Sequence, residues 1–105
     1  MKNAIFYVSY KLKKGASVPD FLQASKRLND EYISKQKGYI SWQQLYDEKK
    51  KTWADFCVFE TMEDVKNFVA NSKNPGELSK KFYSFMNFFS CKVHYYTIER
   101  DYNND

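Results

Sequence analysis

Residues 39–60 read YISWQQLYDEKKKTWADFCVFE, a pattern that predicts a β-hairpin. Aromatic and β-branched residues alternate with other side chains over 39–47 and again over 52–60, and a period of two is typical of strands. The charged run from Asp47 to Lys51 separates the two halves and predicts the turn. The hairpin gives two neighbouring antiparallel strands, to which the flanking segments must add the rest of a sheet.

The segment before the hairpin predicts a strand followed by a helix. Residues 3–12 alternate in the same way as the hairpin strands. Ser17, with Asp20 three residues later, has the spacing of a helix N-cap, and an apolar stripe follows from Val18 to Tyr32. Gly38 is expected to end this crossover with a left-handed turn.

The segment after the hairpin predicts a broken helix and a last strand. Thr61 and Asp64 repeat the N-cap spacing and open a helix over 62–72, which Asn74, Pro75 and Gly76 interrupt. Apolar residues at helical spacing predict a further helix over 78–89. Alternation then predicts a strand over 90–100.

The order βαββαβ predicts an α+β fold of the ferredoxin-like type, as one domain over residues 1–105. It has a four-stranded antiparallel sheet with the helices, the second of them broken, on one face. Both faces of the strands are apolar: Ala54, Phe56 and Val58 alternate with Trp53 and Cys57. A sheet that is apolar on both faces needs a second cover, which 105 residues cannot supply, so we expect a homodimer that packs sheet against sheet.

Composition argues against several functional classes. The net charge is +4, but the lysines are scattered and form no basic stripe with stacking aromatics, so we expect no nucleic-acid partner. One histidine and two separated cysteines give no metal or haem-ligand spacing, and three glycines give no nucleotide loop, so we expect no metal and no cofactor. Without an apolar leader or a membrane-length segment, the protein is expected in the cytoplasm and not in a membrane.

Two residues are candidates for proton transfer. Asp55 lies between Trp53 and Cys57 in an apolar strand, where desolvation would raise its pKa; the alternative is an ion pair at an edge or dimer interface. His94 is the single histidine, and its alternative role is that of a hydrogen-bonded residue of the sheet.

Four further residues are candidates for ligand binding. Trp42 and Trp53 on the hairpin could stack on a flat ligand or simply anchor the core. Gln44 could orient a ligand by hydrogen bonds, and Tyr96 could contribute a hydroxyl group.

Residues 59–68, FETMEDVKNF, resemble the strand-end and helix-start motif of the antibiotic-biosynthesis-monooxygenase-like proteins, the dimeric α/β-barrel superfamily. Lys14-Gly15 and Lys37-Gly38-Tyr39 are similar to that family's layout. The resemblance spans nearly the whole chain and implies a ferredoxin-like subunit of a dimeric α/β barrel, with a pocket between sheet and helices. Members of the family include oxygenases that attack quinols or polycyclic aromatics without metal or flavin, others that degrade haem, and many without known activity.

Three positions depart from the family pattern. Met62 stands where a tryptophan is usual, Phe68 where a histidine is common, and Val8 where the haem-degrading branch has an asparagine. The haem-degrading and quinol-oxidising signatures are therefore both missing. The resemblance implies a cofactor-independent monooxygenase acting on a small aromatic or quinol-like molecule; the alternative is a non-catalytic module that binds a small ligand or a partner.

Overall fold

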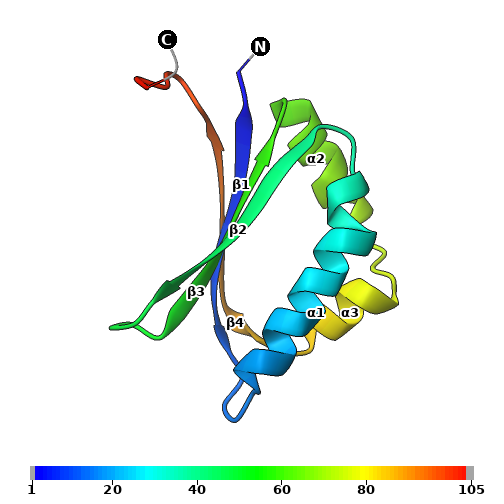
Figure 1. Ribbon diagram of the computed structural model, residues 1–105, viewed down its shortest axis with the longest axis vertical. Coiled ribbons are helices and arrows are strands. Elements are labelled where there is room, and N and C mark those ends of the chain that lie inside the picture. Colours follow the sequence, from blue (N-terminus) through cyan, green and yellow to red (C-terminus); the bar gives the residue numbers. More distant parts are fainter. Residues whose placement is uncertain (1, 104–105) are drawn as a thin grey trace.

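The computed structural model describes residues 2–103, which form one antiparallel sheet with helices on one side (Figure 1). The elements follow the order β1 (Ala4–Leu12), α1 (Val18–Glu31), a short 3-10 helix η1 (Ile33–Lys35), β2 (Tyr39–Asp47), β3 (Thr52–Phe59), α2 (Met62–Asn71), α3 (Glu77–Tyr83) and β4 (Met86–Thr97). The spatial order of the strands is β2-β3-β1-β4. This is the predicted ferredoxin-like α+β fold with a broken second helix.

The helix starts follow from the predicted caps. The hydroxyl oxygen of Ser17 accepts a hydrogen bond from the Asp20 amide, and that of Thr61 accepts one from the Asp64 amide. Gly38 has a φ of +82°, and a Cβ at this position would lie 2.1 Å from the Asp64 carboxylate. Glycine is therefore required at this turn for both its conformation and its lack of a side chain.

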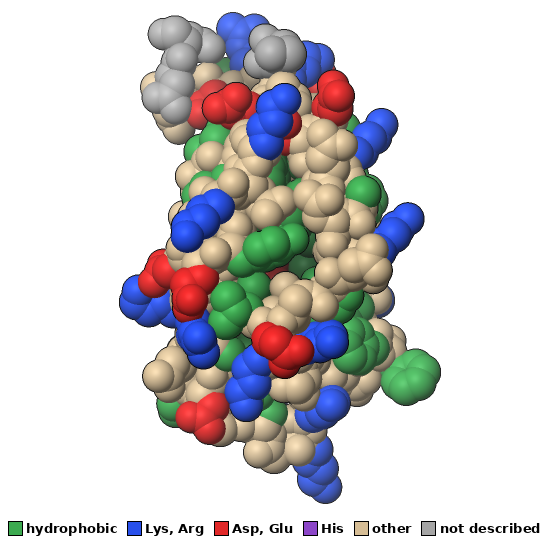
Figure 2. Space-filling view, turned by 90° about the vertical axis from the view of Figure 1, so that its right-hand side faces the viewer, with side chains coloured by type: hydrophobic (Ala, Val, Ile, Leu, Met, Phe, Trp, Pro, Cys, Tyr) green, Lys and Arg blue, Asp and Glu red, His purple; other side chains and the backbone are tan. Residues whose placement is uncertain are grey.

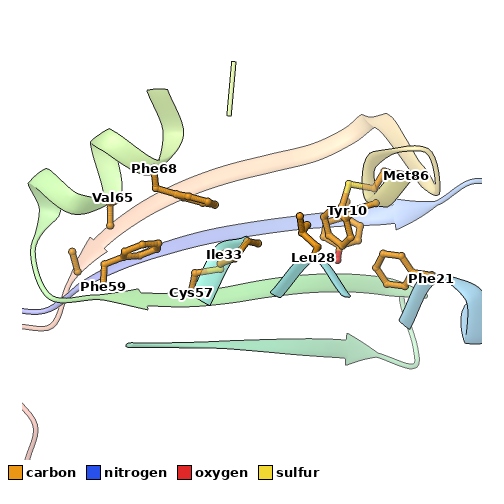
Figure 3. Packing of buried hydrophobic residues seen from close by; sticks show 11 residues of the cluster. Tyr10, Phe21, Leu28, Ile33, Cys57, Phe59, Val65, Phe68 and Met86 are labelled. Atoms are coloured by element: carbon orange, nitrogen blue, oxygen red, sulfur yellow. The ribbon is translucent and has the colours of Figure 1, made fainter. Parts of the chain in front are cut away.

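The core lies between the sheet and the helices (Figure 3). Phe59 packs beneath Val65 and Phe68 of α2, and Tyr10 lies beside Phe21 of α1. The sheet face that meets the helices is thus the one that carries the even-numbered residues of β1, with Asp55, Cys57 and Phe59 of β3. The opposite face carries Ile5, Tyr7, Ser9, Ala54, Phe56 and Val58. No helix among residues 2–103 covers that face (Figure 1).

One predicted boundary, between the last helix and the last strand, is wrong. The helix expected over 78–89 ends at Tyr83, and β4 begins at Met86 rather than at residue 90. Ser9 pairs with Lys92 and Lys11 pairs with Asn87, so residues 88–91 stand opposite Tyr10 alone and form a four-residue β-bulge. The helical spacing of Phe85, Met86 and Phe89 is a coincidence, because the bulge shifts the alternation of the strand.

Side chains hold the bulge in place. The backbone N–H of Lys11 donates to the Ser90 hydroxyl (2.7 Å), and that hydroxyl donates to the Asn87 carbonyl (2.6 Å). The Phe89 amide donates to the Asn87 side chain (3.1 Å). These bonds replace the missing strand pairing, and they leave the Phe89 ring fully exposed.

No helix in residues 2–103 has the length and apolar character needed to cross a membrane.

Candidate functional site

A cavity of about 200 Å³ lies between the sheet and the helices. Every helix and every strand contributes to its wall, and most of the wall is apolar. Aromatic rings dominate it: Phe6, Tyr32, Trp42, Phe68, Phe82, Tyr83 and Phe88. Figure 2 views the molecule from the helix-covered side, where apolar side chains surround a hollow near the centre. The fold therefore places an aromatic pocket where the family resemblance implies one.

Asp55 is the single charged residue of the described cavity wall. It lies on β3, opposite Val8 and Gln44 on the neighbouring strands, and only 4% of it is exposed. Burial disfavours the ionised carboxylate and raises the pKa of Asp55 from 3.8 to about 7, while the hydrogen bond from Tyr10 and the nearby indole N–H of Trp42 oppose this rise. A carboxyl group with such a pKa can both accept and release a proton near neutral pH.

Tyr10 is the closest partner of this carboxyl group. Its hydroxyl group donates to Asp55 Oδ1 over 2.8 Å, and its side chain is fully buried. Burial first, and then the charge of Asp55, raises the pKa of Tyr10 far above its ordinary value. Tyr10 therefore stays protonated and holds one carboxylate oxygen in place.

Gln44 extends the polar cluster toward α1. Its amide group donates to the Ser25 hydroxyl over 2.9 Å, and Ser25 donates to the Phe21 carbonyl over 2.8 Å. Hydrogen bonding by Gln44 also lowers the pKa of Tyr10, but the opposite effect of burial is larger. Gln44 therefore lies beside the Tyr10–Asp55 pair. It is not one of the residues of the described cavity wall.

The two tryptophans occupy different environments. Trp42 is part of the cavity wall and contacts Phe82 edge-on at 5.6 Å. Its indole N–H is buried and makes no hydrogen bond within residues 2–103. It nevertheless favours the ionised form of Asp55 and so lowers the pKa of that carboxyl group. Trp53 packs against Phe21 and Tyr46, at 5.2 and 4.8 Å between ring centroids, outside the cavity wall.

His94 and Tyr96 lie on the other side of the sheet. His94 pairs with Tyr7 of β1, whose side chain belongs to the face without helices. The rings of His94 and Tyr96 stack at 6.0 Å, and the Tyr7 ring contacts both. The structure thus brings together Asp55, Trp42 and Gln44 and separates them from His94 and Tyr96.

Several cavity residues had no individual signal in the sequence. Tyr83 and Phe88 reach the cavity from the end of α3 and from the bulge. The position of Phe88 depends on the bulge, which alternation does not predict. Tyr10 lies outside the described cavity wall, and its contact with Asp55 depends on the register of β1 against β3.

No group of three or more potential metal-ligating side chains occurs within residues 2–103.

Comparison with known proteins identifies the fold. No family model and no curated protein matches this chain. Among solved structures, it is similar to SnoaB, a cofactor-independent oxygenase from Streptomyces nogalater, with a TM-score of 0.73 and 11% identity over 97% of this chain and 98% of that one. It is also similar to a putative antibiotic biosynthesis monooxygenase from Nitrosomonas europaea, with a TM-score of 0.68 and 14% identity over 92% and 90% of the chains.

A third similar structure is a dimeric protein of unknown function with a ferredoxin-like fold from Bacteroides fragilis, with a TM-score of 0.62 and 16% identity over 91% and 96% of the chains. At these identities the likeness shows the fold. The predicted structural resemblance to antibiotic-biosynthesis-monooxygenase-like proteins is confirmed at that level.

Proposed function

We propose that this protein is a cofactor-independent oxygenase for a small, electron-rich aromatic molecule such as a phenol or quinol. The observation that carries the proposal is a buried carboxyl group, Asp55, in a cavity walled by aromatic rings. The pKa of about 7 suits a proton acceptor that works near neutral pH. The similarity to SnoaB, itself a cofactor-independent oxygenase, supports the same class of reaction.

The proposed chemistry uses the substrate as its own reductant. Asp55 accepts the phenolic proton, and the resulting electron-rich phenolate reacts with dioxygen. One oxygen atom enters the ring at a C–H carbon to give a quinone. The other leaves as water with the hydrogens of the O–H and C–H bonds, so the substrate supplies all four electrons. The protein contributes desolvation, orientation through Trp42 and the other rings, and the proton acceptor.

We further propose that single-domain subunits form a homodimer through the sheet face without helices. Tyr7, Phe56 and Val58, which are each half-buried, give that face an apolar surface, and Tyr96 beside them is 50% exposed. A second copy would remove these side chains from water. In this arrangement His94 and Tyr96 belong to the interface and Asp55 to the cavity. The free thiols of Cys57 and Cys91 suit the reducing cytoplasm, which is the location we propose.

Oxygen uptake with hydroquinone and catechol, which each have a single ring, tests the catalytic proposal. We expect uptake above the uncatalysed rate, and a loss of at least about 100-fold in Asp55→Asn, because a general base contributes roughly 100- to 10,000-fold. Glu48→Gln is the matched control, since it removes one negative charge from the exposed hairpin turn. Equal uptake by wild type and Asp55→Asn would show that Asp55 is not the base.

A non-catalytic ligand-binding module is the second candidate. One observation favours it: Met62 and Phe68 replace the usual tryptophan and histidine of the resembled motif. This candidate predicts that a ligand binds without oxygen consumption and that Asp55→Asn leaves its affinity nearly unchanged.

A further inference from the structure

The cavity has an unbalanced charge. Asp55 contributes a carboxyl group, and no lysine, arginine or histidine from residues 2–103 lines the wall. The other polar groups of the wall are hydroxyl and thiol groups and the indole N–H of Trp42. An anionic ligand would therefore meet a like charge without a cation to offset it, and buried charges without a partner are costly.

The shape of the wall favours a positive charge. Trp42 and Phe82 meet edge to face. Further rings come from the C-cap of α1 and from α3, β1 and β4, namely Tyr32, Tyr83, Phe6 and Phe88. Aromatic rings attract cations through their negatively polarised faces, most strongly where water is excluded. A buried carboxylate among several rings is therefore a suitable environment for an ammonium group.

We propose that this cavity preferentially binds a small organic ammonium ion, no larger than one ring with a short arm, which pairs with Asp55 and lies among the aromatic rings. The size limit follows from the volume of about 200 Å³. This preference for an ammonium ion is a property of ligand binding, so it can hold whether or not the protein is an oxygenase. Because an ammonium ion and a phenol would compete for Asp55, such an ion should also act as a competitive inhibitor of the proposed oxygenase.

Three probes of nearly equal size test this preference on the full-length protein: benzylammonium, benzyl alcohol and benzoate. Titration calorimetry at about pH 8, where an acid with a pKa of about 7 is mostly ionised, gives the three affinities. We expect benzylammonium to bind at least about tenfold more tightly than benzyl alcohol, a preference consistent with a charge-assisted hydrogen bond. Benzoate should bind most weakly.

Two variants locate the preference at Asp55. In Asp55→Asn, which keeps the shape of the side chain and an acceptor for Tyr10, the affinity ratio of benzylammonium to benzyl alcohol should fall to about one. Glu48→Gln removes the same charge from the hairpin turn and should keep the wild-type ratio. Should Asp55→Asn fail to fold, the wild type at about pH 5.5 replaces it, since protonation of Asp55 should reduce the ratio in the same way.

Three results would overturn the inference: no binding of benzylammonium, equal or tighter binding of benzyl alcohol or benzoate, and a ratio that is unchanged both in Asp55→Asn and at low pH. The oxygenase proposal fails separately, through absent oxygen uptake with phenols. If the protein prefers benzylammonium but consumes no oxygen, only the oxygenase proposal fails. If it consumes oxygen but shows no such preference, only the ammonium inference fails.

Discussion

At the scale of the residue, Asp55 combines near-complete burial with a hydrogen bond from the Tyr10 hydroxyl group. Its position between Trp53 and Cys57 predicts burial, and the structure places it in the cavity wall. The sequence does not indicate its partner, because Tyr10 is 45 positions away and the contact depends on the register of β1 and β3. The same register separates His94 from Asp55, although both are titratable residues within sheet strands. Side-chain alternation gives two faces for each strand but does not reveal which face meets the helices.

The buried carboxyl group of Asp55 should make stability depend on pH. The pKa of Asp55 is about 7 when folded and near 3.8 when unfolded, so between these values the folded state binds more protons. The contribution of Asp55 to the free energy of unfolding should therefore fall as the pH rises from about 4 to about 7. Above about pH 7 this contribution should stay constant, at a value on the order of 2–4 kcal/mol below its value at pH 4.

Urea unfolding at a series of pH values measures this dependence. Asp55→Asn should remove the decline, because an amide group does not titrate, while Glu48→Gln should keep it. A decline of the same size in wild type and Asp55→Asn would assign it to other groups.

At the scale of the element, caps and turns were predictable and the bulge was not. Ser17 and Thr61 cap their helices as their spacing indicates, because the N-cap bond is local in sequence. Residues 88–91 form a bulge through bonds to Asn87 and Lys11, and the second of these residues belongs to a distant strand. Local spacing therefore predicts helix starts well, and it fails where a long-range pairing sets the conformation.

The three glycines should respond differently to alanine. Gly38→Ala combines a positive φ with a clash against Asp64 and should destabilise the protein by about 1–3 kcal/mol or more. Gly15→Ala has a positive φ of 79° in open space and should cost about 1 kcal/mol. Gly76→Ala has neither problem, but Gly76 is the N-cap of α3, where alanine is less favourable than glycine, so it should cost about 0.5 kcal/mol. Thermal unfolding gives the order, and equal effects at Gly38 and Gly76 would contradict it.

At the scale of the whole molecule, one sheet separates two surfaces with different proposed roles. The helices cover one face of the sheet (Figure 1). That face holds the cavity, and the other face presents Tyr7, Phe56 and Val58. The sequence predicts that both faces are apolar, and from that pattern it predicts a second copy. The sequence could not show that Asp55 and His94 lie on opposite faces of the sheet. The alternation within each strand fits equally well with the two residues on the same face.

A charged residue on the open face should break the proposed dimer. Phe56→Lys places an ammonium group where a second sheet would pack, so sedimentation velocity should show a monomer with native-like circular dichroism. Val18→Lys is the control, because Val18 is an exposed apolar residue on the helix side of the molecule. A monomeric wild type, or a Phe56→Lys variant that remains dimeric, would contradict sheet-to-sheet packing.

The bulge in β4 also bears on aggregation. β4 is an edge strand, and its Phe88-Phe89 pair is the kind of apolar segment that can template the addition of foreign strands into fibrils. A flat ladder is needed for such templating, and residues 88–91 depart from it because they stand opposite Tyr10 alone. An incoming strand would have to displace the bonds among Asn87, Ser90 and Lys11 before it could pair there. The irregularity that brings Phe88 to the cavity thus also protects the edge of the sheet against amyloid-like growth.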